Sequence, residues 1–208
     1  DAQANCSISK YIGTNTGSKP GIESMLDTEY ITGIADGVTT WVYSYPSVDF
    51  CSDLLTWAGD VAGESTHPNV VSLSYGSQKI DFCDATTRTR LSTDVTKLGA
   101  MGVTVVIASG DDGSGGVSRQ GSNNGKLSPS FPASVPSALA VGATFFESGL
   151  AGEEMATTQF GSGGGFSYDY DMPSYQSSAL KAYFAKNPKT GSDTYATNGR
   201  GSPDVSLL

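Results

Sequence analysis

The first residues that could do chemistry are two aspartates, Asp111 and Asp112, at the end of the stretch GVTVVIASGDDG (102–113). The apolar run before them is typical of a parallel strand buried on both faces. Ligands of open α/β sheets bind at the carboxyl ends of such strands, so the position of Asp111 favours a functional site. An ordinary turn is the alternative, because Asp and Gly are also the usual turn residues. The acid pair could also hold magnesium for phosphoryl transfer, although Arg119 and Lys126 are the only basic residues near it.

A second pair of carboxylates, Glu23 and Asp27, lies four residues apart at the start of a predicted helix. This spacing puts both side chains on one face of the helix, one turn apart. Such a pair can share protons and titrate over a wide range of pH. The alternative is a structural role, in which the helix N-terminus offsets the repulsion between the two charges.

The single histidine, His67, lies in the loop STHPN (65–69), before a predicted strand. This position is at the amino end of the sheet, opposite the end at which Asp111 emerges. We therefore expect His67 to be a solvated loop residue. A hydrolase built on this sequence must use carboxylates or a metal in place of imidazole.

Hydrophobic periodicity predicts helices and strands in alternation after a polar, glycine-rich loop at residues 1–21. This order is typical of an α/β fold with a mostly parallel sheet, right-handed crossovers and helices on both faces. The predicted helices start near residues 22, 50, 91 and 180, and the predicted strands cover 38–45, 70–75, 103–108 and 138–141. Residues 145–170 are rich in glycine and predict a hairpin region.

The composition argues against nucleic acid and membrane partners and favours a secreted protein or one of an acidic vesicle. The net charge is −9 with 12 Lys plus Arg, which argues against nucleic acid or an anionic membrane as the partner. No run reaches the ~18 apolar residues of a membrane span. The three cysteines (Cys6, Cys51 and Cys83) have no metal-like spacing, and residues 5–7 form a glycosylation sequon. We expect a secreted protein or one of a lysosomal or other acidic vesicle.

Several segments together resemble the sedolisin, or serine-carboxyl peptidase, family, which has a subtilisin-like fold. The segment ASGDDG (108–113) resembles the family motif around its oxyanion aspartate, and GIESMLD (21–27) matches its Glu-x-x-x-Asp helix. The remaining matches keep the family's order and spacing: VVSLSYG (70–76), SFPASVPSALAVGAT (130–144), SGGGFS (162–167) and GSPDV (201–205).

The resemblance implies roles for single residues. Glu23 resembles the general base, Asp27 the carboxyl that shares its proton, and Asp111 the oxyanion donor, where subtilisins have asparagine. A carboxyl group donates a hydrogen bond only when protonated, so this chemistry implies activity in acid. The resemblance also implies substrate-binding residues that pair with the peptide backbone or line the pocket beneath it: Ser74, Tyr75, Gly76, Ala108, Ser109 and Gly110.

One departure from the family matters, because the sequence contains no Ser-Gly-Thr-x-Ser motif, which holds the family's nucleophile. We expect residues 1–208 to be the central part of one peptidase catalytic domain whose N- and C-terminal parts lie elsewhere. A second polypeptide, cut from the same precursor and possibly disulfide-linked through Cys6, would then carry the serine and the ligands of the calcium ion that the resemblance implies. A peptidase relative that has lost its serine, and is not catalytic, is the alternative.

We also expect a disulfide between Cys51 and Cys83. Each follows a predicted strand of the same parallel sheet, so both should lie at its carboxyl edge, where neighbouring loops come within bonding range.

Overall fold

The computed structural model describes residues 7–14, 21–45, 49–150, 152–186 and 194–208. The chain forms two compact units, Asp1–Pro68 and Asn69–Leu208, and each is described by itself. Within the described residues, no helix is both long and apolar enough to cross a membrane.

The first unit contains the strands β1 (Ile8–Gly13) and β2 (Thr40–Ser44), which pair in parallel, with Ile12 opposite Tyr43. The prediction of a loop over residues 1–21 is therefore wrong at residues 8–13, which form β1. The half-buried face of β1 includes Lys10, whose Nζ lies 2.7 Å from the carboxylate of Glu64. A lysine on the inward face interrupts the apolar alternation from which a strand is recognised.

The helices of the first unit, α1 (Ile22–Ile34) and α2 (Phe50–Gly63), lie where the sequence predicts them. α2 begins at a capping residue, because the side chain of Asp49 accepts a hydrogen bond from the Cys51 amide at 3.1 Å. Its buried residues recur at helical spacing: Leu54, Trp57, Ala58 and Val61. Such a stripe is the buried face of an amphipathic helix.

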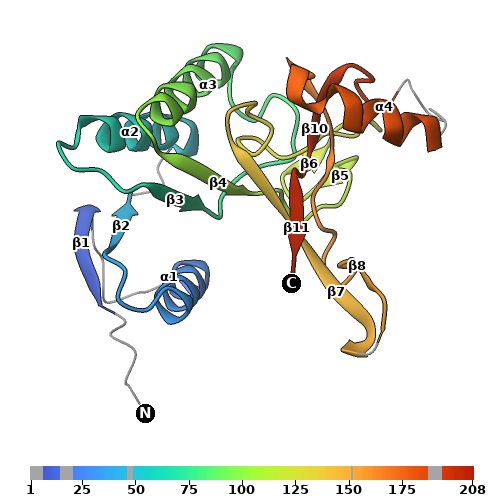
Figure 1. Cartoon of the computed structure of the whole chain (residues 1–208). Helices are drawn as coiled ribbons and strands as arrows, with labels where there is room; N and C mark the ends of the chain where they lie inside the picture. The colour runs from blue at the N-terminus through green and yellow to red at the C-terminus, as the bar shows by residue number, and fades with distance from the viewer. Residues whose placement is uncertain (1–6, 15–20, 46–48, 151, 187–193) are drawn as a thin grey trace. The chain divides into compact units, whose positions relative to one another are not determined.

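The second unit is built on a five-stranded sheet (Figure 1). Four of its strands run parallel in the order β11-β7-β4-β3, and β8 pairs antiparallel with the far end of β7. The strands are β3 (Val70–Leu73), β4 (Thr104–Ala108), β7 (Leu139–Leu150), β8 (Glu154–Ala156) and β11 (Val205–Leu207). The predicted strand at 138–141 is thus too short, because β7 continues beyond the parallel sheet to form the expected hairpin with β8.

Smaller elements complete the second unit. The antiparallel pairs are β5 (Val117–Ser118) with β6 (Gly121–Ser122), and β9 (Gly165–Asp171) with β10 (Gly199–Ser202). The helical elements are α3 (Ala85–Ala100), the short 3-10 helix η1 (Ser174–Gln176) and α4 (Ser177–Lys186). Along the chain, β5 and β6 follow β4, and β9 and β10 follow β7 and β8.

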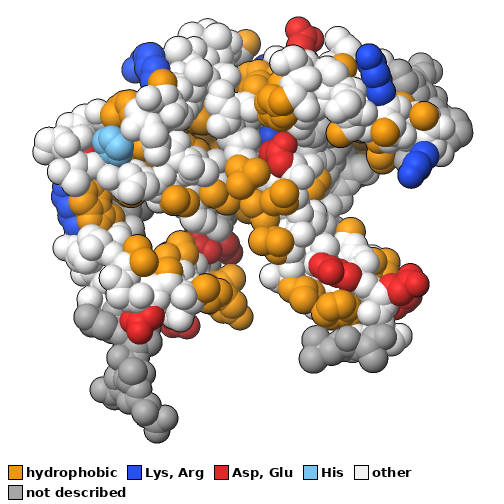
Figure 2. All heavy atoms as spheres, in the orientation of Figure 1, with side chains coloured by type: hydrophobic (Ala, Val, Ile, Leu, Met, Phe, Trp, Pro, Cys, Tyr) orange, Lys and Arg blue, Asp and Glu red, His pale blue; other side chains and the backbone are white. Residues whose placement is uncertain are grey.

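The core of the second unit lies between α3 and one face of the sheet. The buried side chains of α3 (Leu91, Val95 and Leu98) face a strand, β4, whose burial alternates: Val105 and Ile107 are buried, whereas Thr104 and Ala108 are exposed. The expectation that both faces of this strand are buried is therefore wrong within the described parts of the chain. Hydrophobic side chains lie at the surface over β7 and β11 (Figure 2), and Leu139, Val205 and Leu207 are more than one third exposed.

Candidate functional site

The loop that carries Asp111 begins where β4 ends at Ala108. Ser109 is buried, and its amide donates to the Val141 carbonyl of the neighbouring strand at 2.8 Å. Gly110 then turns the chain with φ of +105°, a conformation that L side chains rarely adopt. The turn brings Asp111 out to the surface with half of its side chain exposed. The predicted emergence of this aspartate at the carboxyl end of a parallel strand is confirmed.

A single arginine bridges the acid pair. The guanidinium of Arg119 lies 3.2 Å from the Asp111 carboxylate and 3.4 Å from the Asp112 carboxylate. The Arg119 amide also donates to Asp112 Oδ2 at 2.9 Å. Within the described residues no three Asp, Glu, His or Cys side chains gather as a metal site would require. The arrangement is an ion-paired turn, and nothing in its contacts favours the magnesium alternative.

A glycine-rich segment packs flat against this loop. The Gly113 amide donates to the Gly161 carbonyl at 2.9 Å, and the Gly163 amide donates to the Gly110 carbonyl at 2.6 Å. A Cβ atom at Gly163 would lie 2.0 Å from the carbonyl oxygen of Ser109. The SGGGFS segment therefore needs glycine because two backbones meet here without room for a side chain.

The segment Ser74, Tyr75 and Gly76 continues from β3, the strand that pairs with β4 in parallel. Tyr75 is exposed and Ser74 is half-buried, so this segment keeps surface on which a peptide could pair. A Cβ atom at Gly76 would lie 2.5 Å from the Ser130 hydroxyl, which explains the glycine. Because neighbouring parallel strands end at the same edge, the segment and the Asp111 loop share the carboxyl edge of the sheet.

The carboxyl pair of the first unit lies on α1. Glu23 is in the first turn and exposed, and Asp27 is one turn later and half-buried. Their spacing puts them on the same face of the helix, as the sequence predicts. Glu23 belongs to the first unit and Asp111 to the second. That the two side chains lie close together therefore stays a prediction.

The remaining predicted residues are the three cysteines and the single histidine. Cys51 and Cys83 are both disulfide-bonded, which agrees with the expected bridge. His67 lies in a loop, where its Nδ1 is 3.3 Å from the Pro68 carbonyl. Cys6 lies outside the described residues.

A hollow of about 960 Å³ opens beside the Asp111 loop in the second unit, and Gly113 and Ser114 form part of its wall. Four aromatic side chains line it and contact one another around Phe166, with ring centroids 4.9–5.9 Å apart: Phe166, Tyr183, Phe184 and Tyr195. Its volume is within the range of pockets that bind small molecules, and its wall combines this aromatic cluster with polar groups such as Ser114 and Gln176.

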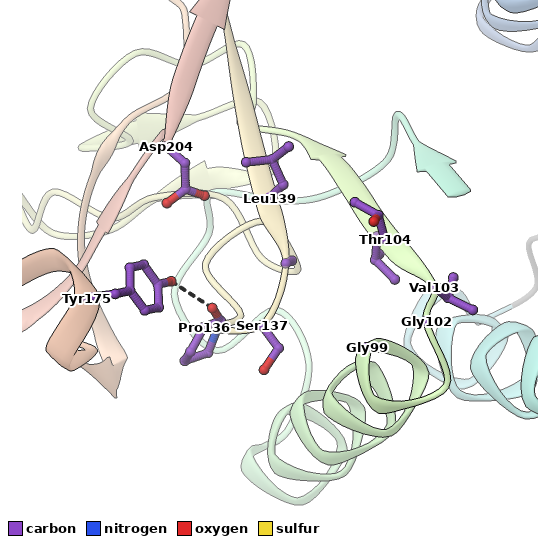
Figure 3. A pocket seen from close by; sticks show the side chains of 11 residues that line it. Gly99, Gly102, Val103, Thr104, Pro136, Ser137, Leu139, Tyr175 and Asp204 are labelled. Carbon is purple, nitrogen blue, oxygen red and sulfur yellow. Dashed lines mark hydrogen bonds between the residues drawn. The ribbon is translucent and has the colours of Figure 1, made fainter. Parts of the chain in front are cut away.

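A second hollow, of about 540 Å³, lies at the amino ends of β4 and β7 (Figure 3). It is lined by the residues that lead into β4 and β7, and the Tyr175 hydroxyl beside it donates to the Pro136 carbonyl at 2.7 Å. The one acid in its wall, Asp204, accepts hydrogen bonds from the Ala140 amide and from Arg200. Its carboxylate is thus engaged in the fold.

Sequence reasoning missed two side chains that hold the Asp111 loop. Arg119 was noted only as a nearby base, although it is ion-paired to both aspartates. Gln78 gives no signal in the sequence, yet it is 2% exposed and bonded to the loop backbone. Neither belongs to a motif, and only the tertiary structure brings them to the loop.

Comparisons with known proteins identify the family. The model of the subtilase family (Peptidase_S8) matches residues 11–205, and the chain therefore belongs to this family. The chain is 34% identical to tripeptidyl-peptidase 1 of Bos taurus over 210 residues, which is 100% of the chain and 37% of that protein. It is also 34% identical to tripeptidyl-peptidase 1 of Homo sapiens over 205 residues, covering 97% of the chain and 36% of that protein.

The fold is similar to that of Pseudomonas sedolisin, a serine-carboxyl proteinase solved in complex with pseudo-iodotyrostatin. The TM-score is 0.65 at 22% identity, and the match covers 96% of this chain and 56% of that one. The predicted α/β subtilisin-like fold is thus confirmed, and the findings together support the predicted place in the sedolisin family. The chain spans a little over one third of the length of the curated relatives that it matches.

Proposed function

We propose that this chain supplies part of the active site of an acid-acting serine-carboxyl peptidase. One observation carries the proposal: Asp111 emerges half-exposed from a glycine turn at the carboxyl end of β4, in a chain that belongs to the subtilase family. The curated relatives are named as tripeptidyl-peptidases and the similar structure as a serine-carboxyl proteinase, which supports peptide-bond hydrolysis as the reaction.

In the proposed mechanism three carboxyl groups divide the work. Glu23 takes the proton of the attacking serine hydroxyl, and Asp27 shares that proton. Asp111, protonated in acid, donates a hydrogen bond to the oxyanion that forms on the substrate carbonyl. One such donor is worth about 2.7–4 kcal/mol of barrier, so the oxyanion role accounts for a factor of about 10²–10³ in rate.

Substrate would be held at the same edge of the sheet. The segment Ser74, Tyr75 and Gly76 would pair with the peptide backbone, as an exposed strand edge does in other peptide-binding proteins. Ala108, Ser109 and Gly110 would line the pocket beneath it. The nearby aromatic hollow lies beside the same loop.

The nucleophile and the metal would come from other residues. The sequence has no Ser-Gly-Thr-x-Ser motif and spans about 37% of its relatives, so we propose that a further segment or a second polypeptide carries the serine. Calcium, which the resemblance to the serine-carboxyl peptidases implies, would be held there as well by oxygen ligands. The bonded cysteines support an oxidising compartment, secreted or lysosomal.

The test is hydrolysis of peptides by the protein that contains this chain together with its remaining segments. We expect multiple turnovers at about pH 4 and loss of activity in Glu23→Gln, because the amide cannot accept the serine proton. Peptides with a free or a blocked N-terminus separate tripeptidyl-peptidase from endopeptidase action, since only an endopeptidase accepts the blocked form. Multiple turnovers by the isolated 208-residue chain would contradict the assignment of roles, because the nucleophile would then lie in this chain.

A chelator at acid pH tests the remaining alternatives. A metal-dependent phosphohydrolase would lose its activity promptly and would act on phosphate esters. A non-catalytic relative would bind peptides without turnover in every assay.

A further inference from the structure

We propose that Gln78 is a positioning residue for Asp111, a role that rests on the proposed function of that aspartate. Gln78 is 2% exposed and lies two residues after the segment that ends at Gly76. Its side-chain amide is surrounded by the glycine-rich loop that carries Asp111 and is hydrogen-bonded to the backbone of that loop. It thereby connects the proposed substrate segment to the proposed oxyanion donor.

The Gln78 side chain makes three hydrogen bonds to backbone groups. Its Oε1 accepts from the Asp112 amide at 2.9 Å, and its Nε2 donates to the carbonyls of Gly113 at 2.8 Å and Ser128 at 3.1 Å. The orientation of the amide follows from its partners, because a backbone N–H can only donate and a carbonyl can only accept. The peptide groups directly after Asp111 are thus fixed by one buried side chain.

Two glycines of the loop, Gly110 and Gly115, lie against the same amide. A Cβ atom at Gly110 would lie 2.6 Å from Gln78 Oε1, and a Cβ atom at Gly115 would lie 3.0 Å from Gln78 Nε2. Gly110 and Gly115 also have positive φ, of +105° and +73°. The loop therefore wraps closely around Gln78, and its glycines leave space for that side chain as well as permitting the turns.

Gln78 is itself held from two sides. Ser77, the preceding residue, forms a two-bond antiparallel bridge with Phe131 at 2.9 and 2.8 Å. The buried Asn123 donates to the Gln78 carbonyl at 2.7 Å and accepts from the Ile80 amide at 2.9 Å. A side chain whose backbone is fixed in this way can impose a fixed position on the loop it touches.

This fixed position matters for catalysis because an oxyanion donor acts through preorganised geometry. A displacement of about 1 Å can cost about 100-fold in rate. Asp111 is half-exposed, and among the described residues its side chain is ion-paired only to Arg119, which is itself exposed, so its placement depends on the backbone that Gln78 holds.

The decisive variants are Gln78→Met, which keeps the length of the side chain without its hydrogen bonds, and Gln78→Glu, which keeps the acceptor for the Asp112 amide. In the active protein at about pH 4, we expect kcat to fall about 10- to 100-fold in Gln78→Met, with KM within about threefold of the parent. Gln78→Glu should lose less, because its protonated carboxyl can still donate to one carbonyl.

The matched control is Gln176→Met. Gln176 also makes three hydrogen bonds, two with the backbone of Gly201 and one with the Asp204 carboxylate, but it does not touch the Asp111 loop. We expect this variant to keep kcat within about threefold while it loses a similar number of hydrogen bonds. An equal fall of kcat in both variants would show general destabilisation and would overturn the proposal.

Hydrogen exchange gives a second measurement that does not need activity. The amides of residues 109–116 should exchange at least about tenfold faster in Gln78→Met than in the parent, and at the parent rate in Gln176→Met. Unchanged exchange, or a change in KM alone, would overturn the proposal. If the parent protein hydrolyses no peptide, the proposed function fails and the catalytic role of Gln78 fails with it, whereas its hold on the loop is still decided by exchange.

Discussion

Replacing Asp111 by asparagine should keep part of the peptidase activity and extend it toward neutral pH. The side-chain amide of asparagine donates a hydrogen bond at any pH, whereas a carboxyl donates only when it carries a proton. The requirement for acid at this position is therefore removed. Glu23 keeps its own dependence on pH, so the extension should be partial.

The expected effect on kcat and on stability follows from two contacts of Asp111, the proposed hydrogen bond to the oxyanion and the ion pair with Arg119. An oxyanion donor is worth about 2.7–4 kcal/mol, so Asp111→Ala should lower kcat by about 100- to 1,000-fold in acid, where Asp111 is protonated, and by less as pH rises. The ion pair with Arg119 is lost in both variants, but its side chains are 62% and 50% exposed, and such a pair contributes about 0–1 kcal/mol. The folded state should thus remain intact, and the difference between the two variants reports the hydrogen bond alone.

The assay is kcat/KM for one peptide across about pH 3 to 7, in the parent, Asp111→Asn and Asp111→Ala. The ratio of Asp111→Asn to the parent should rise steadily with pH. A profile of Asp111→Asn that overlays the parent profile would refute the reasoning, because Asp111 would then not be a protonated donor.

Three further predictions concern stability, each measured by urea unfolding. Arg200→Met should cost about 3–5 kcal/mol, because Arg200 is fully buried and its removal leaves the carboxylate of Asp204, 2.6 Å away, without its charge partner. Cys51 and Cys83 should appear as one bridged pair in non-reducing mass spectrometry, and Cys83→Ser should cost about 3–4 kcal/mol for a closed loop of about thirty residues. Burial raises the pKa of Asp169, so its contribution to stability is present below the unfolded-state pKa and is lost as pH rises through the folded-state pKa. Asp169→Asn should therefore vary less in stability between acid and neutral pH than the parent.

Each of these has an outcome that contradicts it. An Arg200→Met variant as stable as the parent would mean that the buried charge pair adds nothing to the fold. Two free thiols would exclude the bridge. A parent and an Asp169→Asn variant with the same dependence of stability on pH would mean that burial does not affect this carboxyl.

The sequence alone determined the order of the elements and the positions of the acids. Apolar runs and helical spacing predicted β2, β3, β4, the start of β7 and the four helices, because burial of apolar side chains follows periodicity along the chain. The motifs placed Asp111 at the end of a strand and put Glu23 and Asp27 on one helical face. These features depend on residues close together in the sequence, which is why they could be predicted.

The tertiary structure decided what depends on distant residues. β1 forms by pairing with β2, although the inward Lys10 hides its pattern, and β7 extends beyond its apolar run to meet β8. The hold of Gln78 on the Asp111 loop joins residues 34 positions apart through a buried amide. A single glutamine with no motif carries no signal in sequence, because its partners are backbone groups that only the folded chain brings within hydrogen-bond distance.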